Sequence, residues 1–335
     1  MHIRKVQVTG RSSFILTLPK DWIKAQNIQK NQEIKLISQP DGSLLIAPHM
    51  KFEENPRIKT FEIDKKTNVK LLLNQLFAAY IVGFSQIKIL TTERIPHDIR
   101  EIVFKFVNSV IGLEIIEETE LSYVIKDVLK AKEATFDKEI NRMVAILRSM
   151  HKDAIEALEM GNRELAISVM ERDRQINRMN RHITRQTTMS IEDVGFAESI
   201  ETSMRDVLAY FVIALYLELI GDYTVLIARE VVRFQEAKYK ISASIGISTD
   251  IGGLSNKVLE LLELANNSWN EQNIPVAQEA IDRFQELHKE CDKMLRKLGD
   301  APVSINNIIE NIRKTGKLIQ NIAFITIDRA SATDL

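Results

Sequence analysis

The sequence predicts a multidomain α+β protein with a short β-rich N-terminal part, a small α/β unit and a long all-α C-terminal part. Three observations predict this order. Short β segments fill residues 1–50, strands and helices alternate over 57–130, and every strong hydrophobic period after about Phe136 is helical. A chain of 335 residues is also long enough for two or three domains that each bury a core.

The composition is that of an ordinary soluble globular protein in a reducing compartment. The chain has 45 Lys and Arg against 46 Asp and Glu, so its total charge predicts no polyanionic partner. Its single cysteine, Cys291, excludes a disulfide framework and a Cys-based zinc site. Because the N-terminal "MHIRKVQVTG" lacks the apolar run of a signal peptide, we expect a cytoplasmic protein.

Residues 1–50 carry four short strand segments, "IRKVQV", "FILTL", "EIKLIS" and "LLIA", and the hairpin signal "PDGS" lies between the last two. Pro19 opens a helix of one or two turns between the second and third segments. Four short strands cannot close a core alone, so this part predicts pairing with a second copy of the chain.

The same residues concentrate positive charge. Seven Lys or Arg and three acids give residues 1–50 a net charge of +4, although the whole chain carries −1. A dimer of this part would present a two-fold basic ridge to DNA phosphates, with a serine adding hydrogen bonds. The alternative is a dimerisation domain whose lysines are only solvated. The candidate DNA-binding residues are Arg4, Lys5, Arg11, Ser12, Lys20 and Lys24.

The middle part, 57–130, predicts the order strand, helix, strand, helix and two strands. It contains neither a phosphate-binding loop of the GxxxxGK[ST] type nor a GxGxxG motif. A spacer or dimerisation role is therefore favoured over ligand sensing for this unit.

The C-terminal part predicts six helices that form an internal duplication. When the two halves are aligned, Met179 pairs with Met294 and Gly221 pairs with Gly316. We therefore expect two three-helix bundles in tandem, over 136–240 and 248–330. The six helical segments lie near 137–160, 164–190, 197–236, 250–271, 275–298 and 302–330.

One stretch of the third segment, Val207 to Ala228, is apolar apart from Glu218 and Asp222. Its length would suit a membrane span, but two central acids argue against one. The two acids lie four residues apart on one helix face, where like charges repel, and apolar surroundings worsen that repulsion. We therefore expect a positive charge opposite them.

Two kinds of positive charge fit. A divalent or ferric ion (Fe, Zn, Mn or Mg) would take carboxylate oxygens inside the bundle, with Asp173 on the preceding helix as the third ligand. Alternatively, an arginine of that preceding helix neutralises the pair; the candidates are Arg174, Arg178 and Arg181.

The second half of the duplication carries opposite charges at the equivalent positions. Arg313 and Lys317 stand where the first half has the two acids, and they face His288 and Asp292. Two cations would repel a metal ion, so we expect an internal ion-pair cluster there and at most one metal centre per chain.

Two resemblances join these observations. The motif "ELIGDYTVLIA", following "ERDRQINRM" on the preceding helix, resembles the PhoU family of phosphate-uptake regulators over about Phe136 to Ala330. That resemblance implies a metal-binding role for Asp173, Glu218 and Asp222, although Asn177 stands where the family pattern has a further acid. The opening "GRSSFILTLPKDW" and "DGSLLIAP" are similar to the AbrB and MazE type of swapped-hairpin DNA-binding domain.

Together the resemblances imply an archaeal-type PhoU-related regulator with a dimeric swapped-hairpin β-barrel as its head. The favoured function is a cytoplasmic regulator that binds DNA and relays phosphate status to phosphate-uptake genes, through a transporter, a signalling partner or a bound metal. The alternatives are an adaptor that docks on a phosphate-transporter ATPase and a metal-storage or metal-sensing protein. Since no GxSxG or HExxH motif is present, no enzymatic activity is expected.

Overall fold

A computed structural model describes residues 3–10, 12–38, 42–48, 57–129, 135–236, 245–298 and 303–332. The chain divides into two compact units, Met1–Asn55 and Pro56–Leu335. One of the predicted DNA-binding residues, Arg11, lies outside the described residues.

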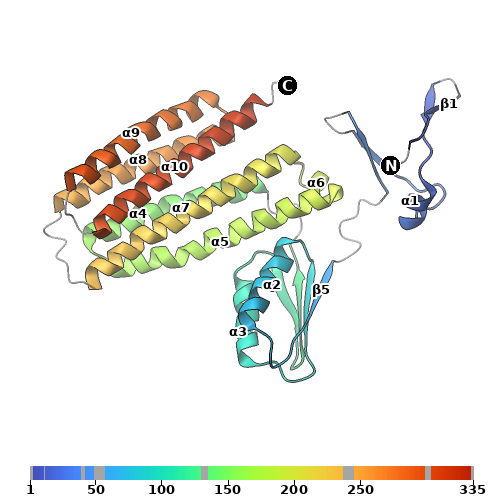
Figure 1. Cartoon of the computed structure of the whole chain (residues 1–335), viewed down its shortest axis with the longest axis horizontal. Coiled ribbons are helices and arrows are strands. Elements are labelled where there is room, and N and C mark those ends of the chain that lie inside the picture. Colours follow the sequence, from blue (N-terminus) through green and yellow to red (C-terminus); the bar gives the residue numbers. More distant parts are fainter. Residues whose placement is uncertain are drawn as a thin grey trace. The chain divides into compact units, whose positions relative to one another are not determined.

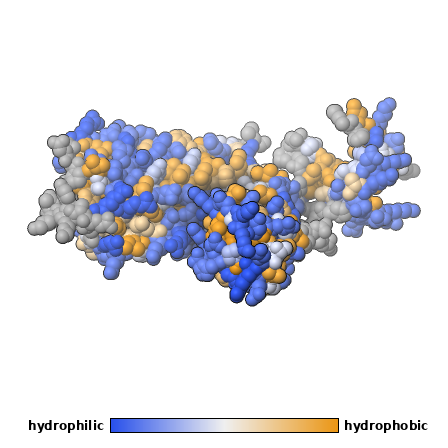
Figure 2. Space-filling view, turned by 60° about the horizontal axis from the view of Figure 1, so that its bottom comes forward, coloured by the Kyte–Doolittle hydropathy of each residue, from blue (hydrophilic) through white to orange (hydrophobic). Residues whose placement is uncertain are grey.

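The first unit consists of two separate antiparallel strand pairs and one short helix. Strands β1 and β2 pair with Val8 opposite Phe14, and β3 pairs with β4. None of its described residues is buried, and Phe14 is 74% exposed; Figure 2 accordingly shows apolar surface on this unit. A single copy therefore has no core here, and the closed barrel stays a prediction. The elements are β1 (Gln7–Thr9), β2 (Ser13–Ile15), α1 (Lys20–Ala25), β3 (Lys35–Ser38) and β4 (Leu44–Ala47).

The second unit begins with the predicted α/β part, whose four strands form one sheet in the order β5-β6-β8-β7. Strands β5 and β6 are parallel, as two strands joined by a helix must be, and β8 is antiparallel to both of its neighbours. The two helices pack on the sheet through buried side chains such as Leu76, Phe106 and Ile125. The elements are β5 (Ile58–Glu62), α2 (Val69–Ile81), β6 (Gln86–Leu90), α3 (His97–Asn108), β7 (Leu113–Glu118) and β8 (Ser122–Asp127).

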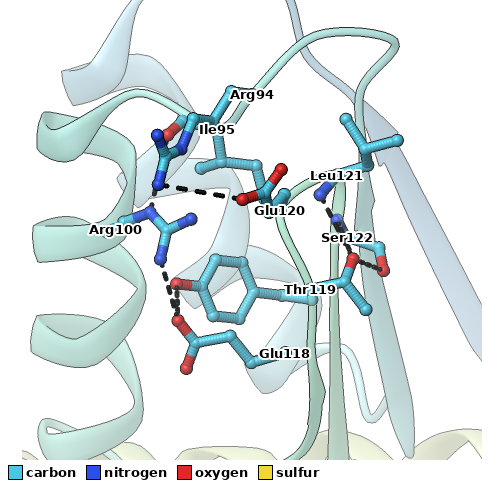
Figure 3. Close-up of polar contacts among 9 residues, drawn as sticks. Arg94, Ile95, Arg100, Glu118, Thr119, Glu120, Leu121 and Ser122 are labelled. Atoms are coloured by element: carbon cyan, nitrogen blue, oxygen red, sulfur yellow. Dashed lines mark hydrogen bonds and ion pairs between the residues drawn. The ribbon is translucent and has the colours of Figure 1, made fainter.

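A polar network ties the loop before α3 to the turn between β7 and β8 (Figure 3). Arg100 and the hydroxyl of Tyr123 both donate to Glu118 Oε1, at 3.1 and 2.7 Å. Burial, followed by Glu118, raises the pKa of Tyr123 to about 12, which keeps this hydroxyl a donor. Arg94, in the loop before α3, lies 3.8 Å from Glu120, in the turn between β7 and β8.

The rest of the second unit is helical, and its six long helices lie side by side in Figure 1. Helices α4, α5 and α7 pack on one another, as do α8, α9 and α10, and the contacts of α7 with α10 and of α4 with α8 join the two sets. Each set is a three-helix bundle, and the buried apolar side chains of both sets form one continuous core. The helices are α4 (Phe136–Met160), α5 (Arg163–Glu192), α6 (Val194–Ser199), α7 (Met204–Glu236), α8 (Ile245–Glu271), α9 (Ile274–Leu298) and α10 (Val303–Ser331).

The structure corrects one predicted helix. The period over 197–236 predicts a single helix, but α6 and α7 are separate. Glu201 has a positive φ of 51°, which interrupts a helix. Ser203 then caps the next helix, because its hydroxyl accepts from the backbone of Asp206 at 3.1 Å and donates to that carboxylate at 2.9 Å.

Helix α7 is apolar because it is the central helix of this part of the chain. Among the described residues it is the one helix long and apolar enough to cross a membrane. It nevertheless contacts α4, α5 and α10. Contact with three helices accounts for the apolar residues on the buried faces of α7.

His151 on α4 lies in this core, is 2% exposed and has no hydrogen-bond partner for either ring nitrogen among the described residues. Burial lowers its pKa from 6.5 to about 4. The unfolded chain therefore binds a proton more readily than the folded one between these pH values, and stability falls as the pH drops through this window.

We expect the wild type to lose roughly 3 kcal/mol of unfolding free energy through this residue between pH 7 and pH 4. The substitution His151→Met should flatten that part of the curve, measured by urea unfolding at a series of pH values. The exposed His97 is the matched control, and His97→Gln should leave the slope unchanged. An unchanged slope in His151→Met would contradict the assignment.

Candidate functional site

The three predicted acids come together where α5 crosses α7. Asp173 projects from α5 toward Gly221, which lies between Glu218 and Asp222 on α7. A Cβ atom on Gly221 would lie only 3.1 Å from Asp173 Oδ1, so the glycine permits this close approach. Backbone proximity at the crossing thus brings carboxylates from two helices into one electrostatic cluster, which we call the acid cluster (Asp173, Glu218 and Asp222).

The acid cluster is short of positive charge. Burial raises the pKa of all three carboxyls, and the charge of Asp222 raises those of Asp173 and Glu218 further. Arg181 lowers the pKa of Asp173 and Glu218, and Arg229 lowers that of Asp222, but in each case the net shift is upward. The ionised form of the cluster is therefore disfavoured, as expected for like charges held close together when two of them are half-buried.

The residues do not form a ready metal-ligand set. Asp173 Oδ1 is buried without a hydrogen-bond partner in the described part of the chain, as a waiting ligand would be. Its second oxygen, however, accepts from Asn177 Nδ2 at 2.6 Å. Among the residues that the structure describes, no three His, Cys, Asp or Glu side chains are arranged to hold one metal ion. The metal centre therefore stays a prediction that requires the side chains to move.

Of the arginines expected to neutralise the acids, two make their hydrogen bonds elsewhere. Arg178 donates to the carbonyl of Val110 from Nε at 3.2 Å and Nη2 at 3.0 Å. Arg181 donates to the carbonyl of Ser109 at 3.1 Å and lies over the ring of Phe77 at 4.7 Å. Both carbonyls follow the C-terminal end of α3, where backbone acceptors lack helical partners and the helix dipole favours a cation.

A third arginine of α5, Arg185, donates to backbone carbonyls at the C-terminal end of α2. It is 3% exposed and donates to the carbonyls of Tyr80 and Phe84, the latter at 3.1 Å, and to Asp127 Oδ2 at 2.7 Å. We call Arg178, Arg181 and Arg185 the arginine seam, because they join α5 to the α/β part. The seam was not predicted; the recurrence of arginine every three or four residues was its signal in the sequence.

Beside the arginine seam, the backbone after α2 also approaches α5 closely. Gly83, just after α2, has a φ of +93°, and a Cβ there would lie 2.7 Å from Met189 Cγ on α5. Nearby, Arg57 pairs with Glu192 at 2.8 Å. Since Arg181 belongs to the seam and also acts on the acid cluster, one side chain links the α/β part to that cluster.

The second bundle carries the expected ion pairs in place of acids. Arg313 pairs with Asp292 at 3.1 Å and with Glu310 at 2.6 Å, and His288 lies 3.6 Å from Asp292. The predicted ion-pair cluster is therefore confirmed for Arg313. Lys317 instead donates to Gln320 Oε1 at 2.7 Å.

In the first unit, the described members of the predicted DNA-binding set all lie on the surface. Arg4, Lys5, Ser12, Lys20 and Lys24 are exposed. The last two lie one helical turn apart on α1. These positions leave the basic side chains accessible to a polyanion.

Comparison with known families matches two parts of the chain. Residues 140–231 match the model of the PhoU domain, and residues 7–54 match the model described as antidote-toxin recognition MazE, bacterial antitoxin. The chain contains a PhoU domain behind a MazE-like domain. The match covers α4 to α7 and includes the whole acid cluster, whereas α8 to α10 lie outside it.

Individual proteins are also similar to this chain. The phosphate-specific transport system accessory protein PhoU homolog 1 of Thermotoga maritima is 23% identical over 189 residues, which are 56% of this chain and 74% of that protein. The crystal structure of PhoU from Pseudomonas aeruginosa has a TM-score of 0.50 at 18% identity and covers 59% of this chain and 96% of its own, so the helical fold is shared. The Streptococcus pneumoniae phosphate transport system regulatory protein PhoU has a TM-score of 0.45 at 15% identity, over 57% of this chain and 91% of its own.

A charge-removing substitution measures the electrostatic state of the acid cluster. Because the pKa of Glu218 is raised by burial and by its acidic neighbours, its ionisation at neutral pH lowers stability, and this cost is absent once it is protonated. We expect Glu218→Gln to raise Tm by about 2 °C or more at pH 7.5. The difference should vanish below about pH 4, where the wild-type carboxyl is also protonated.

The matched control is Glu310→Gln in the second bundle, which makes the same chemical change at a carboxylate paired with Arg313. That variant should not gain stability at pH 7.5. A lower Tm for Glu218→Gln at pH 7.5 would show that Glu218 is already neutralised, and it would favour the arginine alternative.

The arginine seam makes a separate prediction. Arg185→Met removes a buried charged donor from the carbonyls of Tyr80 and Phe84 and from the 18%-exposed carboxylate of Asp127, so we expect a loss of about 3 kcal/mol or more in urea unfolding. Arg57→Met breaks the nearby pair with Glu192, whose side chains are 40% and 45% exposed, and should cost less than about 1 kcal/mol. Equal losses in the two variants would contradict the role assigned to Arg185.

Proposed function

We propose that this protein is a cytoplasmic, homodimeric regulator of phosphate uptake whose MazE-like head binds DNA under the control of its PhoU domain. The observation that carries the proposal is the presence of both domains in one chain. The T. maritima relative is named for an accessory role in phosphate-specific transport. In one chain, a domain that responds to phosphate status could then change the DNA binding of the head directly.

The chemistry of the head supports DNA as its ligand. Residues 1–50 carry a net charge of +4. The described basic side chains of the predicted set are exposed, and a dimer would double that charge on a two-fold surface. Attraction of this kind to phosphates provides affinity, and contacts of polar side chains to base edges provide sequence preference.

The head's lack of a core supports dimerisation. Apolar side chains on both strand pairs are exposed in a single copy, including Phe14 at 74%, Val8 at 65% and Leu36 at 62%. Burial of these side chains against a second copy would provide the hydrophobic stabilisation that the unit lacks alone. The swapped-hairpin barrel is the arrangement that we propose for this pairing.

The proposed input to the PhoU domain is a change in charge at the acid cluster, through a bound cation or a protein partner. A hard cation held by Asp173, Glu218 and Asp222 would relieve their repulsion, and oxygen ligands suit Mg²⁺, Mn²⁺ or ferric iron. Elemental analysis of protein purified without added metal should then show a stoichiometric ion that is lost in Glu218→Gln. Protein that stays metal-free after reconstitution would leave a partner as the input.

The DNA-binding proposal is tested on the DNA upstream of the phosphate-transporter genes of the source organism. We expect binding that weakens steeply with salt, and Arg4→Ala/Lys5→Ala/Arg11→Ala should lower the slope of log K against log salt by about 5 for a dimer, if each side chain contacts one phosphate. The triple variant Lys65→Ala/Arg94→Ala/Lys105→Ala removes as many exposed cations outside the head and should leave the slope unchanged. Equal affinity for unrelated DNA would contradict a promoter-specific role.

A second function is supported by the name of the T. maritima relative, a transport-system accessory protein. In that case the head only dimerises, and the helical part docks on the ATPase of a phosphate transporter. Affinity capture from lysate with and without nuclease separates the two. Nuclease-resistant recovery of the transporter ATPase, together with no DNA preference, would establish the adaptor.

A further inference from the structure

Helix α7 presents a regular stripe to solvent on the side that its neighbours leave open. Over Met204 to Asp222 the residues between the stripe positions are mostly buried or half-buried. Leu208 is 58% exposed and Leu215 is 39% exposed, although both belong to the one helix of the described residues that is long and apolar enough to cross a membrane. We call this surface the outer stripe; its residues are Arg205, Leu208, Val212, Leu215, Leu219 and Asp222, and each is exposed or half-buried.

The spacing of the outer stripe is that of a coiled-coil seam. Successive members are separated by 3, 4, 3, 4 and 3 residues. This is the alternation of a and d positions that packs one helix against another along its length. Among its members, Arg205 donates to the carbonyl of Ala332 just after α10 at 3.3 Å, Val212 and Leu219 are half-buried, and Leu208, Leu215 and Asp222 are exposed.

The outer stripe is also self-complementary when read in the opposite direction. Reversal about its midpoint places Arg205 opposite Asp222, Leu208 opposite Leu219, and Val212 opposite Leu215. Every layer is then either apolar against apolar or cation against anion. A two-fold axis requires this kind of pairing, because each residue must find its counterpart on an identical surface.

Helix α10 carries an exposed aromatic residue, Phe324, at the level of the midpoint of the stripe. It runs antiparallel to α7, as shown by Arg329 Nε bound to Asp206 at 2.7 Å near one end and by Lys314 over the ring of Tyr223 at 5.5 Å near the other. Between these contacts, Phe324 falls at the level of Val212, and it is 45% exposed.

We propose that the outer stripe pairs with the outer stripe of a second copy of this chain, antiparallel and about a two-fold axis near the middle of Val212 to Leu215. Arg205 of one copy then faces Asp222 of the other at each end of the seam. The pair with the partner's Arg205 and a cation held in the acid cluster are alternative roles for the carboxylate of Asp222. This interface lies in the helical unit, is separate from the proposed head dimer, and does not depend on DNA binding.

The charges at the two ends favour a second copy over a lipid surface. A bilayer would accept the apolar middle of the stripe, but it would not pair an arginine at one end with an aspartate at the other. Two antiparallel copies satisfy both ends with the same pair. Ion pairs that flank an apolar seam fix register and orientation, as charges do in coiled coils.

Crosslinking in the full-length chain tests this register. Arg205→Cys/Asp222→Cys, treated with a short bismaleimide, should give a covalent dimer as the main product. Within one copy the two positions are separated by 17 helical residues, about 25 Å, so an intramolecular crosslink is out of reach. Each single variant should give little dimer, because two equivalent positions are about 25 Å apart in the antiparallel pair. The native Cys291 is buried, so the reagent is expected to react with the introduced cysteines.

A second pair of substitutions tests the next layer independently. Leu208→Cys/Leu219→Cys should crosslink in the same way, whereas adding Leu215→Glu should abolish crosslinking in both double variants by placing carboxylates at the centre of the seam. Far-ultraviolet circular dichroism confirms that these variants at solvent-facing positions remain folded. Full crosslinking in the single variants, or none in either double variant, would overturn the pairing. Binding of the wild type to neutral lipid vesicles without crosslinking would assign the stripe to a membrane surface instead.

Discussion

The close crossing of α5 and α7 at Gly221 is the constraint on which the rest of the helical unit depends. Because no side chain separates the helices there, Asp173 lies against the turn that carries Glu218 and Asp222. Three carboxylates then share a half-buried space, and their pKa values rise together. The arrangement costs folding free energy in the absence of a cation, so it is a position where a ligand or partner has the largest effect.

The same two helices define what faces outward. Helix α7 packs against α5 on one side and α10 on another, and the outer stripe lies on its remaining surface. Helix α5 packs one face against α7, and its arginines donate to carbonyls at the ends of α2 and α3. Arg181 acts on both the acid cluster and the helix end at Ser109. A change of charge in the acid cluster therefore alters the electrostatic surroundings of the side chain that binds the C-terminal end of α3.

The sequence predicted those features that depend on local period and on residue spacing. Six helical segments and the α/β order follow from hydrophobic repeats, and Glu218 and Asp222 share a face because they are four residues apart. The seam of Arg178, Arg181 and Arg185 could not be derived in the same way, since most of its acceptors are backbone carbonyls about 70 to 105 residues away along the chain. The break between α6 and α7 was missed because apolar periodicity continues across it, whereas a positive φ at Glu201 and the Ser203 cap determine it.

The two bundles share a close helix crossing at a glycine but differ in the charged residues beside it. Gly316 in α10 repeats the role of Gly221, because a Cβ there would lie 2.8 Å from Leu287 and 3.0 Å from Phe284 of α9. The second bundle keeps this close crossing but has Arg313 and Lys317 in place of the acids. The crossing therefore does not require carboxylates. Since the acid cluster lowers stability and packing does not need it, its presence in the bundle that matches the PhoU domain is best explained by a function that uses its charge.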